Sequence, residues 1–222
     1  MKSVTRDIPS LTVTDLTVYV EVRLPRPQLA LAGLYSGVAD YSVGPGKDID
    51  FGDVIISRDS DLVINLELEV DPLFKVEFPG GSNLLSLEPE GGWLNWINRG
   101  RKPTRLWREQ NFNFSTSIPF KVSMSCEHTE GDQCAIAASD GHQVPVEVRM
   151  TLPNGMQDDA SQPVRQYLLN TVDTPHFTPK QFILGRQATL HFEVPKPQME
   201  NMLNHPGKAY NGSVTLVWDP QI

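Results

Sequence analysis

The sequence predicts an all-β fold of the immunoglobulin-like sandwich type, and three observations support this. Apolar and polar residues alternate with a period of two over several stretches, which is typical of half-buried strands. Turn-forming residues separate these stretches, and the chain holds 18 Pro and 16 Gly, which are many for a helical protein. No helical pattern of ten or more residues interrupts them, and only residues 198–203 are expected to form a single helical turn.

The longest alternating stretch covers residues 112–126, where aromatic and aliphatic residues share one parity and mostly polar residues the other. Pro119 lies among the polar residues and cannot donate a backbone hydrogen bond, so we expect a strand edge or a bulge there. Further strands are predicted at 62–68, 74–78, 144–152, 188–194 and 214–218.

The first 24 residues change parity within one apolar run. Leu11 and Val13 share one parity, and the apolar residues from Leu16 to Leu24 share the other, so the register flips at Asp15. Two interpretations stay open: one bulged first strand, or a donor extension followed by a strand. We therefore treat residues 1–24 as this segment and residues 25–222 as a single β-sandwich domain.

Charge and motifs exclude several classes of function. The formal net charge is −8, which disfavours binding to nucleic acid because the protein's field repels phosphate. The chain has no apolar run of eighteen residues, so membrane insertion is not expected. Its start has no signal-peptide pattern, which leaves two explanations open: a cytoplasmic protein, or a mature or trimmed exported domain with a new Met1. Nucleophile-elbow, phosphate-loop and zinc-protease motifs are missing, and His191 is expected to be solvated. We expect no enzyme, cofactor or metal, and interpret Asp48, Asp50 and Asp53 as an acidic turn.

The two cysteines, Cys126 and Cys134, enclose a polar, turn-like segment. This spacing favours a disulfide across the base of a hairpin over a zinc half-site, because zinc needs further ligands at compact spacing. A disulfide in turn indicates folding in an oxidising compartment.

The segment from Trp93 to Arg108 combines aromatic and cationic residues within an acidic chain. Its tryptophans and cations are Trp93, Trp96, Arg99, Arg101, Lys102, Arg105, Trp107 and Arg108. Aromatic faces and guanidinium groups together suit an anionic glycan. The other interpretation is that the tryptophans belong to the core and the cations flank a solvated loop.

The C-terminal run HPGKAYNGSVTLVWDPQI, residues 205–222, resembles the closing strand of bacterial chaperone–usher fimbrial subunits. The matching residues are Pro206, Gly207, Tyr210, Gly212, Val214, Leu216, Trp218 and Asp219. The stretches LHFEVPKP at 190–197 and GLYSGVADYSVGPG at 33–46 are similar to minor or tip subunits of enterotoxigenic adhesion fimbriae.

This resemblance implies an incomplete immunoglobulin-like sandwich that is finished by a donated strand. In such fimbriae a periplasmic chaperone first fills the gap, and at the outer-membrane usher the N-terminal extension of a neighbouring subunit replaces it. Carried onto this chain, the donor residues are Leu11, Val13, Leu16 and Val18, and the groove strand carries Val214, Leu216 and Trp218.

The expected function is thus that of a structural or adhesive subunit of an extracellular bacterial fimbrium, reached through the periplasm. Its partners are other fimbrial subunits, the chaperone, the usher and a host glycan. The alternative is a stand-alone carbohydrate-binding module that uses the Trp93–Arg108 segment.

Overall fold

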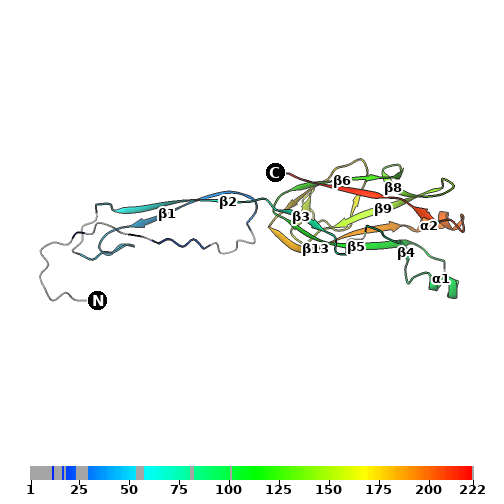
Figure 1. Ribbon diagram of the computed structural model, residues 1–222, viewed down its shortest axis with the longest axis horizontal. Helices are drawn as coiled ribbons and strands as arrows, with labels where there is room; N and C mark the ends of the chain where they lie inside the picture. Colours follow the sequence, from blue (N-terminus) through cyan, green and yellow to red (C-terminus); the bar gives the residue numbers. More distant parts are fainter. Residues whose placement is uncertain are drawn as a thin grey trace.

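The computed structural model describes residues 12, 17, 19–23, 30–53, 58–80, 83–100 and 102–221 of the 222-residue chain. It confirms the all-β fold: two antiparallel sheets enclose the main core, and a separate two-stranded hairpin extends from them along the long axis of the molecule (Figure 1).

The larger sheet has nine strands, six of which follow the order β14-β8-β9-β13-β5-β3. Strands β4, β7 and β11 attach to β5, β8 and β9 respectively. The bounds are β3 (Phe74–Glu77), β4 (Glu88–Pro89), β5 (Leu106–Thr116), β7 (His128–Glu130), β8 (Gln133–Ala138), β9 (Gln143–Thr151), β11 (Tyr167–Leu169), β13 (Ile183–Val194) and β14 (Tyr210–Asn211).

The smaller sheet has the order β10-β12-β6-β15. Its strands are β6 (Phe120–Cys126), β10 (Met156–Asp158), β12 (His176–Pro179) and β15 (Val214–Pro220). Strand β15 therefore stands at one edge of this sheet, just as β3 stands at one edge of the other.

The core lies between the two sheets and follows the alternation read from the sequence. Phe112 and Phe114 point inward from β5, and Phe120 and Val122 point inward from β6, each no more than 1% exposed. Phe114 and Phe120 pack with ring centroids 5.3 Å apart, so the aromatic side chains of the two sheets interlock directly.

The stretch 112–126 forms two strands instead of one. Strand β5 ends at Thr116 in the larger sheet, and β6 begins at Phe120 in the smaller sheet. The expected edge or bulge at Pro119 is instead a corner where the chain crosses between sheets. Thr116 closes this corner, because its Oγ1 donates to the carbonyl of Ile118 at 2.7 Å. The alternation stays in phase across this corner, because the apolar residues at even-numbered positions point toward the shared core from both strands.

Two short helices complete the sandwich. Helix α2 (Lys196–Leu203) lies where one helical turn is expected, and buries Met199. Helix α1 (Leu94–Arg99) has no buried residue and ends at Gly100, whose φ of 63° suits a glycine and whose N–H donates to the carbonyl of Trp96. Six residues give too few apolar contacts for a periodic signal, so the sequence pattern does not reveal α1.

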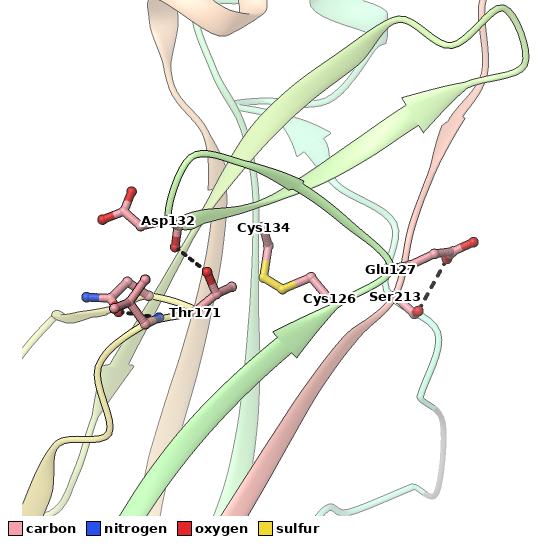
Figure 2. Close-up of a disulfide and its surroundings, with 8 residues drawn as sticks. Cys126, Glu127, Asp132, Cys134, Thr171 and Ser213 are labelled. Carbon is pink, nitrogen blue, oxygen red and sulfur yellow. Dashed lines mark hydrogen bonds between the residues drawn. A yellow bond between two sulfur atoms is a disulfide. The ribbon is translucent and has the colours of Figure 1, made fainter.

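Cys126 and Cys134 form the expected disulfide, with their Cα atoms 5.5 Å apart (Figure 2). The bond joins the end of β6 to β8, so it links the two sheets as well as closing the hairpin loop. Beside it, Glu127 receives a hydrogen bond from the hydroxyl of Ser213 at 3.2 Å (Figure 2). The start of β15 is thereby held next to the covalent link.

The expectation of a solvated His191 is wrong, because this side chain is only 8% exposed. It does point to the outer face of β13, as the alternation predicts, but Trp107 of the neighbouring strand stacks on it with centroids 5.7 Å apart. Its Nε2 lies 2.8 Å from Oε2 of Glu193. The alternation in the sequence predicts on which face of a strand a side chain lies. It does not predict which other side chains cover that face.

The hairpin consists of β1 (Gly33–Ser42) and β2 (Asp61–Val70), which pair only with each other among the described strands. At its base, the N–H of Ala32 donates to the carbonyl of Ser117, with 3.4 Å between nitrogen and oxygen. Figure 1 shows the hairpin at one end of the long axis and α1 at the other.

Candidate functional site

The candidate functional site is the open edge formed by β15 in the smaller sheet. Residues 214–220 pair antiparallel with β6, from Val214 opposite Cys126 to Pro220 opposite Phe120. Strand β15 has no second partner among the described strands, so it is an edge strand of the sheet that they form.

The side chains that β15 directs toward the core are only partly covered. Val214, Leu216 and Trp218 pack against the main core cluster but remain half-buried, and the residues between them are exposed. On the adjacent strand β6, Val122 and Met124 are 1% and 5% exposed. Burial therefore falls off at the edge strand of the smaller sheet.

Strand β3 forms the facing edge in the larger sheet. Phe74 and Val76, together with Phe78 just beyond the strand, pack against the same core cluster and are likewise half-buried. The ring of Phe112 lies 5.2 Å from Phe78 and 5.6 Å from Trp218, measured between centroids. Phe112 thus contacts both edges and forms a shared floor beneath them, and we call the two edges together the β3–β15 edge.

Tyr210 and Gly212, which form a Y-x-G motif in the C-terminal run, explain how the chain positions β15. Tyr210 belongs to β14 in the larger sheet, and its hydroxyl lies 2.8 Å from Nδ1 of His142. Gly212 then lets the chain cross to the smaller sheet, because a Cβ there would lie 2.9 Å from the carbonyl oxygen of Ala135. The motif therefore places the closing strand at the edge of the smaller sheet.

The sequence does not identify β3 as the second side of this edge. Its alternation predicts a strand, but no sequence signal shows which strands end up at sheet edges. The predicted donor residues Leu11, Val13, Leu16 and Val18 lie outside the described residues, so their role stays a prediction.

The Trp93–Arg108 segment divides into two structural groups. Trp93 and Trp96 lie on and beside α1 with ring centroids 6.1 Å apart, and Trp96 lines a cleft of about 220 Å³ together with Glu90 and Lys102. Trp107 lies on β5 against His191, with the guanidinium of Arg105 5.7 Å from its ring centroid. Ligand binding by this segment stays a prediction.

Acidic neighbours neutralise some of its cations. Arg105 pairs with Glu90 at 3.3 Å and with Glu193 at 3.8 Å, and Arg108 pairs with Glu88 at 3.8 Å. Arg99 and Lys102 are exposed and form no ion pair within the described part of the chain, while Arg101 lies outside it. The sequence shows the cations. It does not show that the pairing of β4 with β5 brings Glu88 and Glu90 close to them.

Within the described ranges, no cluster of three or more His, Cys, Asp or Glu side chains could hold a metal ion. No helix among the described residues is long and apolar enough to cross a membrane. The disulfide is typical of proteins that fold outside the reducing cytoplasm. No protein-family model matches this chain, and no curated protein matches it either.

Proposed function

We propose that this chain is a structural or adhesive subunit of a bacterial surface fimbria, and that it assembles by accepting a strand along the β3–β15 edge. The observation that carries the proposal is the half-burial of the inward-facing side chains of β15 over a fully buried aromatic floor. A strand laid along β15 would pair its free backbone groups and cover Val214, Leu216 and Trp218.

The driving force combines hydrogen bonds with apolar burial. A strand that pairs with β15 gains main-chain hydrogen bonds along a seven-residue edge. Its alternate side chains would reach toward the floor at Phe112, where each buried aliphatic side chain contributes roughly 1.5–3 kcal/mol. An alternating apolar sequence therefore fits this edge best, and residues 10–24 of a second copy carry two such runs, 11–13 and 16–24, of opposite parity.

Thermal unfolding of the full chain tests the proposal, alone and with a synthetic peptide of residues 10–24 in excess. At a peptide concentration of about 100 Kd, binding stabilises the folded state by about 2.7 kcal/mol. For a domain of this size we expect the melting temperature to rise by roughly 5–10 °C.

Two control peptides separate the two contributions. One replaces Leu11, Val13, Leu16 and Val18 with serine, which removes the apolar side chains. The other keeps every side chain but carries N-methyl groups at alternate residues, which removes the backbone donors. We expect both to lose most of the shift. A melting temperature that the native peptide leaves unchanged would contradict strand acceptance.

A further inference from the structure

The β1–β2 hairpin carries an exposed face on which no other described strand packs as a partner. The residues on this face are Leu34, Ser36, Val38, Asp40 and Ser42 of β1 and Asp61, Val63, Asn65, Glu67 and Glu69 of β2. Leu34, Val38 and Val63 are 73%, 63% and 54% exposed. A two-stranded hairpin alone is marginally stable in water, so contact with a further surface would stabilise it.

The hairpin region concentrates the negative charge of the chain. Residues 33–70 hold eight carboxylates against two cations, a formal net charge of −6 out of −8 for the whole chain. Four of those carboxylates, on Asp40, Asp61, Glu67 and Glu69, belong to the exposed face just described, and neither strand contains a Lys or Arg. We call this surface the acidic hairpin face.

The opposite end of the molecule has the complementary character. Residues 88–108 hold five cations against two carboxylates, a formal net charge of +3. At α1, Trp93, Leu94 and Ile97 are 39%, 68% and 74% exposed, beside the exposed cations Arg99 and Lys102, which pair with no described carboxylate. We call this surface the basic α1 face. Each face thus combines exposed apolar side chains with an excess of charges of one sign, as the centre and rim of an interface do.

We propose that the acidic hairpin face of one copy of this chain docks on the basic α1 face of the next copy. Because the two faces lie at opposite ends of the long axis, one molecule cannot pair its own faces (Figure 1). Such a contact joins unlike surfaces of successive copies, so it builds an open head-to-tail row. It goes beyond strand acceptance, since it uses none of the residues of the β3–β15 edge.

The contact is a small one. Strands of ten residues give the hairpin a face about 33 Å long, which corresponds to a weak, transient interface when it acts alone. Within a row that strand exchange already holds together, the effective concentration of the two faces reaches the millimolar range. The contact would then set the angle between successive copies.

Charge reversal in the full chain tests the proposal by analytical ultracentrifugation at concentrations up to roughly 1 mM, the effective concentration in such a row. One variant combines Glu67→Lys and Glu69→Lys, and the other combines Arg99→Glu and Lys102→Glu. We expect each variant alone to self-associate at least about tenfold more weakly than the unmodified chain, because like charges then face each other. An equimolar mixture of the two variants restores association, since opposite charges meet again at every contact.

The matched control combines Lys180→Glu and Arg186→Glu, two exposed cations of the sandwich that form no ion pair within the described part of the chain. It changes the net charge as much as the α1 variant does and should leave association unchanged. Raising the salt from about 0.1 M to about 1 M shortens the screening length from about 10 Å to about 3 Å, and should weaken the contact in the unmodified chain.

Cysteine cross-linking gives a second readout that does not depend on charge. Copies carrying Val38→Cys are mixed with copies carrying Ile97→Cys, and we expect this pair to form an intermolecular disulfide faster than Val38→Cys with Lys180→Cys. Equal rates would overturn the proposal. The proposal would also be overturned if the unmodified chain stayed monomeric at every concentration, or if the charge reversals had no effect on self-association. A third contrary result is that the α1 reversals abolish binding to anionic glycans and leave self-association intact.

The test is independent of strand acceptance. None of these substitutions touches Val214, Leu216 or Trp218, so the peptide-induced rise in melting temperature should persist in every variant. Absence of the peptide effect alone would contradict the proposed function. Failure of the mixed variants to restore association would contradict the head-to-tail contact alone.

Discussion

Trp218 of the edge strand β15 packs against Phe112 of β5 with ring centroids 5.6 Å apart and planes inclined by 62°. Phe112 is fully buried, whereas Trp218 is only half-buried although it points toward the same core. One contact thus joins β5, the strand beside the β3 edge of the larger sheet, to the edge strand of the smaller sheet.

Replacing Trp218 with alanine should destabilise the fold and weaken strand acceptance together. Full truncation of a buried aromatic side chain costs about 3–5 kcal/mol, so we expect about 2 kcal/mol for this half-buried one. Urea unfolding measures the loss. Val217→Ala is the matched control, because Val217 is 53% exposed and its truncation should change stability by less than about 0.5 kcal/mol. Equal effects of the two substitutions would contradict the inward position of Trp218.

Gly212→Ala should destabilise the sandwich by about 1–3 kcal/mol, because its Cβ would meet the backbone oxygen of Ala135 at 2.9 Å. The obstacle is main chain, so a side-chain rotation cannot relieve it. Gly37→Ala is the comparison, since no atom lies within 4 Å of a Cβ placed there. Chemical denaturation of both variants checks this, and an unaltered Gly212→Ala protein would mean that β14 and β15 can separate freely.

Reduction of the Cys126–Cys134 bond should lower stability by about 2.5 kcal/mol, the chain-entropy value for a loop closed over eight residues. Unfolding curves with and without reductant measure the difference. A variant with both cysteines replaced by alanine should not respond to reductant. Mass spectrometry that found two free thiols in the native protein would remove the main physical support for folding in an oxidising compartment.

Acid should loosen the loop that joins β1 to β2. The hydroxyl of Ser42 donates to Asp48 at 2.6 Å, and this bond, with a second from the Ser42 N–H, lowers the pKa of that carboxyl below its ordinary value. Because the folded-state pKa is depressed, the stabilisation is present above the unfolded pKa of about 3.9 and is lost as the pH falls through the folded value.

Amide hydrogen exchange at Ser42, followed from pH 6 down to about pH 2, reports this change. After correction for the intrinsic rate, protection should fall in the acid part of the range. Ser42→Ala removes the hydrogen bond from the hydroxyl to Asp48 and should move the transition toward higher pH. The same acid transition in both proteins would show that this hydroxyl does not hold the loop.

Much of the fold, but less of the candidate site, can be predicted from the sequence. Period-two alternation locates the core strands because it depends only on which residues face the interior, as Phe112 and Phe120 show. It does not assign strands to sheets, so the corner at Pro119 is hidden in an unbroken parity. Cys126 and Cys134 are predictable as a pair from their spacing alone. The partners of Trp107 and His191 are not, because cross-strand register depends on contacts between residues about 80 positions apart.

The antiparallel pairing of β15 with β6 has a consequence for how the protein folds. Its partners Cys126 and Val214 are 88 positions apart, so the chain must close a long loop before this pairing stabilises anything. Topologies dominated by such distant contacts fold slowly. Until β15 arrives, both the outer side of β6 and the aromatic residues beside it are open to any extended segment, from this molecule or another. Strand β15 therefore competes with other extended segments for pairing with β6. A partner that covers β6 during that interval would determine which segment pairs with it.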